Sequence, residues 1–133
     1  MDEEIFRISK NTVRAKSLKE MAEERLADIK HEKKPYKIVE QYYEIIKELI
    51  TAIMYSDGFK TLSHKALVLY LGSNYDKFFS KDEFILIDEI RRLRNDILYY
   101  GKKVDSAFLI NKEEQLENII KQLLKIVNEG LTP

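Results

Sequence analysis

The segment from Tyr36 to Ser56, YKIVEQYYEIIKELITAIMYS, is the most apolar stretch of this 133-residue chain. One set of its apolar residues recurs at helical spacing: Val39, Tyr43, Ile46, Ile50 and Ile53. A second set forms an adjoining stripe: Tyr42, Ile45, Leu49 and Ala52. A helix that is apolar on two adjoining stripes packs against more than one neighbour, so we predict a central helix that ends before Asp57-Gly58.

Helices are also predicted on both sides of this central segment. Before it, helical spacing of apolar residues from about Glu3 to Lys30 predicts one long amphipathic helix that ends ahead of Pro35. After it, Ser63 is typical of an N-cap, which predicts a short helix over His64–Leu71. Gly72 suits the left-handed position that follows such a helix.

Two further helices complete the prediction. Ser80 and Glu83 have the spacing of a capping box, so a helix is expected from about Lys81 to Tyr100, stopped by Gly101. A second capping pattern over residues 111–114 begins a last helix, which ends at Gly130. Residues 104–110 are predicted as extended chain or loop. The expected fold is a single all-α domain over residues 1–133, an antiparallel four-helix up-and-down bundle with one additional short helix and no strand.

Composition excludes several classes of protein. The 23 basic and 23 acidic residues leave no net charge, which excludes a large uniform positive field but not a local basic patch. Without cysteine, the chain has no thiol chemistry, cysteine-bound zinc or disulfide. Phosphate-loop, dinucleotide and HExxH zinc signatures are missing, so no metal or cofactor is expected. The acidic start and the lack of a long apolar run predict a cytoplasmic protein without a membrane span.

The stretch RRLRNDILYYG over residues 91–101 carries the most suggestive chemistry. Arginines bind phosphate through paired hydrogen bonds, and tyrosines stack on bases. Arg92, Asn95 and Tyr99 share one helical face, whereas Arg94 lies well around the helix from Tyr99. We therefore predict that Arg91, Arg92, Arg94 and Tyr100 bind phosphate or RNA.

In this stretch the chain resembles the HEPN family. Members carry Arg, a polar residue, three variable positions and then His on a late helix, and Arg94-Asn95-Asp96-Ile97-Leu98-Tyr99 has that frame. The central helix with its exit at residues 57–61 and the short segment from Ser63 to Leu67 are similar to the family's second and third helices. The resemblance covers nearly the whole chain, and its strength lies in the order and spacing of short motifs.

The resemblance implies a homodimer and binding of RNA or a nucleotide. Many members are metal-independent ribonucleases and toxins that pair with a minimal nucleotidyltransferase as antitoxin, and others only bind RNA or nucleotides. Tyr99 stands where the family has His. Because tyrosine titrates at about pH 10, it does not exchange protons near neutrality as histidine does. The resemblance thus implies Arg94, Asn95 and Tyr99 as the candidate catalytic residues. With Tyr in place of His, Arg94 and Asn95 remain phosphate-facing candidates, and Tyr99 a binding residue.

Other interpretations stay open. The charges of the late helix also fit a solvated face, with Asp88 and Arg92 as an ion pair one turn apart. His64, directly after the N-cap, fits a surface position in the first turn of its helix. As functions, the alternatives are a metal-independent ribonuclease that works despite Tyr99 and a non-catalytic helical module that binds a partner protein.

Overall fold

The computed structural model describes residues 4–132, and helices hold most of them. The helices are α1 (Thr12–Ile29), α2 (Pro35–Asp57), α3 (His64–Asn74), α4 (Lys81–Tyr100) and α5 (Ser106–Leu131), with a 3-10 turn, η2, at Asp76–Phe78. Two short strands, β1 (Ile5–Arg7) and β2 (Phe59–Thr61), pair antiparallel with Phe6 opposite Lys60. The all-α class is therefore confirmed.

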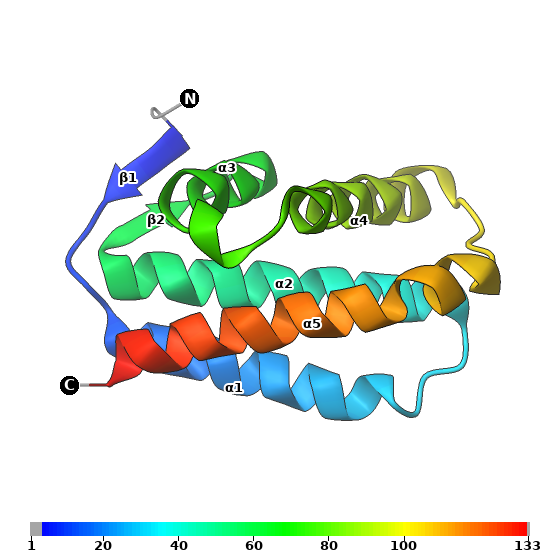
Figure 1. Ribbon diagram of the computed structural model, residues 1–133, viewed down its shortest axis with the longest axis horizontal. Helices are drawn as coiled ribbons and strands as arrows, with labels where there is room; N and C mark the ends of the chain where they lie inside the picture. Colours follow the sequence, from blue (N-terminus) through cyan, green and yellow to red (C-terminus); the bar gives the residue numbers. More distant parts are fainter. Residues whose placement is uncertain (1–3, 133) are drawn as a thin grey trace.

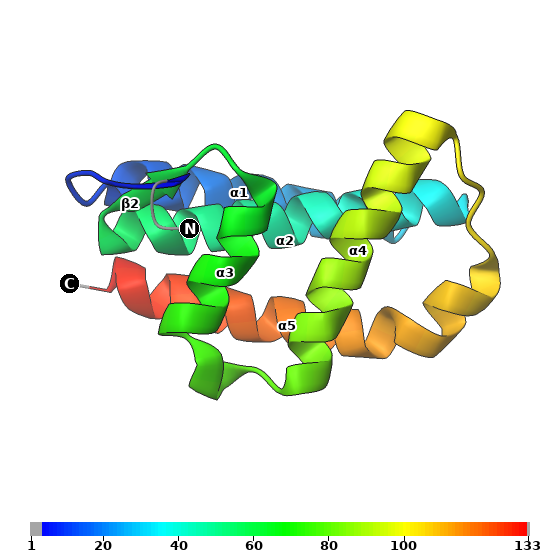
Figure 2. The same cartoon turned by 90° about the horizontal axis from the view of Figure 1, so that it is seen from above.

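Helices α1, α2 and α5 lie side by side with roughly aligned axes, and α3 and α4 cross over α2 (Figures 1 and 2). α1 runs opposite to α2, whereas α2 and α5 run in the same direction (Figure 1). The structure does not confirm the simple up-and-down order expected from the sequence. A short connection places two consecutive helices next to each other, but side-chain packing sets the angle at which they cross.

The prediction of a central helix is confirmed, because α2 contacts each of the other four helices. Its buried side chains occupy both predicted stripes and include Ile45, Leu49 and Ile53. Gly58 ends α2 with a φ of 90°, and a Cβ there would lie 3.0 Å from the carbonyl oxygen of Ile8. Glycine is needed at this turn for both reasons.

The N-terminal prediction is wrong in its extent. Glu3 lies outside the described residues, and Ile5–Arg7 form β1 rather than the start of a helix. α1 begins only at Thr12, because the Asn11 side chain accepts a hydrogen bond from the backbone N–H of Arg14 at 3.0 Å. The strands, found where no strand was expected, pair segments that lie more than fifty residues apart.

Two other boundaries are corrected. α5 begins at Ser106, because the Asp105 side chain caps it by accepting a hydrogen bond from the N–H of Ala107 at 3.0 Å. Most of residues 104–110 are therefore helical, and residues 111–114 lie inside the helix rather than at its start. Gly72 lies inside α3, which continues to Asn74. A Cβ at Gly72 would lie 4.0 Å from the Phe84 ring, an ordinary van der Waals distance, so this position does not require glycine.

Candidate functional site

The capping box and the glycine stop of α4 are confirmed and set the position of the predicted site. Ser80 accepts a hydrogen bond from the N–H of Glu83 at 3.1 Å, and Glu83 accepts one from the N–H of Ser80 at 2.8 Å. Gly101 closes the helix with a φ of 63°. α4 therefore holds its arginines in a defined helical register.

Arg94 faces α2. Its guanidinium carbon lies 5.3 Å from the centre of the Tyr43 ring, which is a cation–π distance. Its Nη2 atom lies 3.4 Å from a carboxylate oxygen of Glu44, a long and therefore weak ion pair. With 18% of its side chain exposed, Arg94 is held in place by α2 yet keeps some access to solvent.

Arg91 and Arg92 share one acidic partner, Asp88. Arg91 Nη2 lies 2.9 Å and Arg92 Nη2 lies 2.8 Å from different oxygens of that carboxylate. The Arg91 side chain is 17% exposed and the Arg92 side chain 73%. Two cations on one carboxylate leave an excess positive charge, and Arg92 presents its share to solvent.

The remaining predicted residues lie apart from Arg94. Tyr99 and Tyr100 are 70% and 83% exposed, and Asn95 is half-buried. Among the described residues, none forms a side-chain hydrogen bond with Asn95 or with the hydroxyls of Tyr99 and Tyr100. The structure thus brings Arg91 and Arg94 to the α2 side of α4 and leaves both tyrosines at its open end.

Sequence analysis missed a partner of Tyr43. The His64 ring, at the first position of α3, lies 5.7 Å from the Tyr43 ring, centre to centre. Tyr43 therefore contacts a cation from α4 and an imidazole from α3. Burial lowers the pKa of His64 below its usual range, and the nearby charges of Lys47 and Arg94 lower it further. The Ser63 N-cap located this histidine in the sequence, but no local signal pairs it with Tyr43.

We call this group the Tyr43 cluster. It comprises Tyr43, Glu44 and Lys47 of α2, His64 of α3, and Arg91 and Arg94 of α4. Glu44 also accepts an ion pair from Lys47 at 2.8 Å, so it is shared by two cations. Three cations of the cluster, Lys47, Arg91 and Arg94, face two carboxylates, those of Glu44 and Asp88. The excess creates a local positive potential on a chain without net charge.

The Tyr43 hydroxyl differs from those of the other buried tyrosines in having no hydrogen-bond partner among the described residues. Three other buried or half-buried tyrosines, Tyr42, Tyr70 and Tyr75, each donate to a carboxylate at 2.6 or 2.7 Å. Tyr43 is buried, with 4% of its surface exposed, and its hydroxyl forms no hydrogen bond with a described residue. Burial raises the pKa of Tyr43 to about 12, with Arg94 opposing that rise, so the phenol keeps its proton and can donate it to an acceptor.

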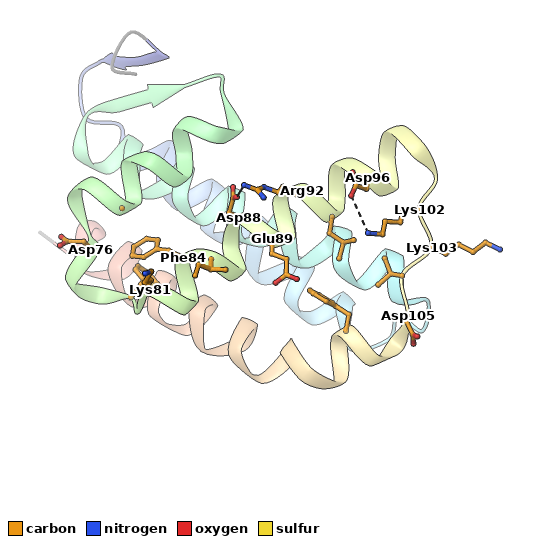
Figure 3. Close-up of a pocket in the computed structure, with 16 residues that line it drawn as sticks. Asp76, Lys81, Phe84, Asp88, Glu89, Arg92, Asp96, Lys102, Lys103 and Asp105 are labelled. Atoms are coloured by element: carbon orange, nitrogen blue, oxygen red, sulfur yellow. Dashed lines mark ion pairs between the residues drawn. The ribbon is translucent and has the colours of Figure 1, made fainter.

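A groove lies on the other side of α4, between it and the start of α5 (Figure 3). It has a volume of about 1210 Å³, and apolar side chains such as Phe84, Leu93 and Phe108 form part of its wall. Five carboxylates and four cations line it, including the pairs Asp88–Arg92 and Asp96–Lys102. This near balance of charge does not favour a polyanion in the groove.

Other classes of site were sought across the part of the chain that the structure describes. Within residues 4–132, no three acidic or histidine side chains are placed to hold a metal ion. Among the helices of the same range, none has the length and apolar character needed to cross a membrane. Comparison of the chain with protein-family models, curated proteins and solved structures gave no match.

Proposed function

We propose that this protein binds the phosphates of RNA or of a nucleotide at the Tyr43 cluster. The observation that carries this is the excess of cations there: Lys47, Arg91 and Arg94 act on His64 against the carboxylate of Glu44. Arginine binds phosphate with directed, charge-assisted hydrogen bonds. The weak Arg94–Glu44 contact at 3.4 Å can be exchanged for a phosphate at little cost.

RNA would contact more of the surface around the Tyr43 cluster than a single nucleotide would. Tyr99 and Tyr100 expose their rings at the end of α4, one to two turns beyond Arg94. Exposed aromatic rings next to a basic patch are the means by which proteins hold single-stranded nucleic acid without reading its sequence. A single nucleotide would occupy only the phosphate contacts.

The HEPN-like assignment is part of the same proposal. It is supported by the order and length of the long helices α1, α2, α4 and α5, which would supply a four-helix frame, and by the Arg94–Tyr99 spacing. We further propose a cytoplasmic homodimer that acts with a minimal nucleotidyltransferase. In such a dimer, two copies of the cluster would combine their positive potential.

The first experiment measures binding of a labelled uridine oligonucleotide by fluorescence anisotropy in EDTA, with uridine monophosphate as the single-nucleotide arm. We expect Arg94→Ala to weaken oligonucleotide binding by about tenfold and to lower the salt dependence by about 0.7 in the logarithmic slope. Arg14→Ala is the matched control. Arg14 also stacks on a tyrosine, Tyr55, with its guanidinium carbon 4.8 Å from the ring centre, but it is not part of the Tyr43 cluster.

Each outcome has a definite meaning. Equal affinity of Arg94→Ala and wild type would refute the proposed site, and equal loss in Arg14→Ala would show a general effect of removing surface charge. Cleavage of the oligonucleotide that disappears in Arg94→Ala would establish a metal-independent ribonuclease. If wild type neither binds nor cleaves, the proposal fails, and the groove beside α4 makes a protein-binding module the better hypothesis.

A further inference from the structure

His64 differs from the chain's other histidine in its surroundings. His31 is exposed in the connection between α1 and α2. His64 is half-buried against Tyr43, and neither of its ring nitrogens forms a hydrogen bond with a described residue. A partly desolvated imidazole without a protein partner can still accept or donate a hydrogen bond to a ligand.

The charges around His64 come from two helices. α2 contributes Lys47 and Glu44, and α4 contributes Arg91 and Arg94. Glu44 alone favours the imidazolium, whereas the three cations and burial oppose it. In the free protein, His64 is therefore neutral near pH 7.

A bound phosphate would reverse this balance. It would place a negative charge beside the cations that oppose protonation, and the imidazolium could then donate a hydrogen bond to a phosphate oxygen. Tyr43 spans the two groups, since the Arg94 guanidinium and the His64 ring both lie within 5.7 Å of its centre. The Tyr43 hydroxyl, which has no hydrogen-bond partner among the described residues, adds a third donor to those of Arg94 and His64.

We infer that His64 is a further phosphate-contacting residue of the Tyr43 cluster, and that it takes up a proton when a phosphodiester binds. This inference rests on the proposed function. It makes RNA affinity depend on pH in a range where the arginines and the phosphodiester keep constant charge. Between the pKa values of His64 in the free and bound states, affinity would rise by about tenfold for each unit of falling pH.

The test compares wild type, His64→Gln and the control His31→Gln with the uridine oligonucleotide, from about pH 8 to about pH 5.5. Uridine and its diesters do not titrate in this interval. Wild type and His31→Gln should bind more tightly as pH falls, whereas His64→Gln should bind with nearly constant affinity. Calorimetry in two buffers of different ionisation heat should show proton uptake on binding by wild type and none by His64→Gln.

The outcomes separate the two proposals. Binding by wild type with the same pH dependence in His64→Gln, or without proton uptake, would overturn the role of His64 and leave phosphate binding intact. Absence of binding by wild type at every pH would overturn both. Circular dichroism at each pH checks that all three proteins remain folded.

Discussion

Two polar clusters connect α3 to α2, and they are built in opposite ways. At the end of α2, Asp57 accepts hydrogen bonds from the hydroxyls of Tyr70 and Tyr75, each at 2.7 Å. In the Tyr43 cluster, earlier on α2, the tyrosine hydroxyl has no partner among the described residues. We call the first group the Asp57 cluster; its polar groups satisfy one another.

We expect the Asp57 cluster to contribute mainly to the stability of the fold and the Tyr43 cluster mainly to ligand binding. A hydrogen bond completed inside the protein stabilises the fold, and its loss leaves a buried group without a partner. A group without a protein partner contributes less to stability and remains free for a ligand. The contrast therefore predicts that substitutions in the Asp57 cluster reduce stability, and that those in the Tyr43 cluster reduce affinity for RNA.

The largest expected effect on stability is that of Asp57→Ala. Removing the carboxylate deprives two tyrosine hydroxyls of their acceptor, which should lower the free energy of unfolding by about 3 kcal/mol. Urea unfolding followed by circular dichroism measures this. Asp76→Ala, at an exposed position nearby, is the control and should change stability by less than about 0.5 kcal/mol. Equal effects of the two substitutions would remove the contrast.

A pair of neighbouring tyrosines sharpens the comparison. Tyr42 donates to a Glu113 carboxylate oxygen at 2.6 Å, so Tyr42→Phe should lower the free energy of unfolding by about 1.5 kcal/mol. Tyr43→Phe removes a hydroxyl that has no described partner, so stability should change by less than about 0.5 kcal/mol while RNA affinity falls. A larger loss of stability in Tyr43→Phe than in Tyr42→Phe would contradict our distinction.

Stability should depend on pH through the Tyr43 cluster. Because the folded state lowers the pKa of His64, the unfolded chain binds the proton more strongly. Stability from this residue is therefore present above the unfolded pKa of about 6.5 and is lost as pH falls from that value through the lower pKa of the folded state. His64→Gln should lose less stability than wild type between about pH 7.5 and about pH 5.5 in urea unfolding.

The Asp57 cluster supplies the contrast in that measurement. Burial and the neighbouring carboxylate raise the pKa of Tyr70 and Tyr75 above its ordinary value, so neither phenol titrates in this interval. An unchanged pH dependence in His64→Gln would show that other groups account for it.

The smallest effects are expected at the open end of α4. Tyr99→Phe and Tyr100→Phe remove hydroxyls from exposed side chains, so stability should change by less than about 0.5 kcal/mol. RNA affinity should also be unchanged, because stacking depends on the ring. A loss of affinity in Tyr99→Phe alone would show that its hydroxyl contacts the ligand.

Much of the helical structure could be predicted from the sequence because its signals are local. The Ser80 and Glu83 side chains bond to backbone groups three residues away, and Gly101 supplies the left-handed stop. The same local reasoning failed where signals compete. Asn11 begins α1 later than periodicity indicated, and Asp105 begins α5 earlier than the capping pattern at residues 111–114 indicated.

The candidate site was predictable only in part. The arginines of residues 91–94 are adjacent in the chain, and their chemistry was evident. Which face each presents, and which carboxylate each meets, depends on how α4 crosses α2. Arg94 and Tyr99, which the predicted resemblance to the HEPN family pairs, lie in different surroundings, and Arg94 shares the Tyr43 ring with His64 instead.

The sequence by itself determined the helical class, the central position of α2 and the location of the arginines, because helix periodicity, caps and glycine stops act within a few residues. Only the tertiary structure decided that α2 and α5 run in the same direction and that Tyr43 meets both His64 and Arg94. These contacts join residues from three helices, and side-chain packing between helices sets the crossing angles that bring them together.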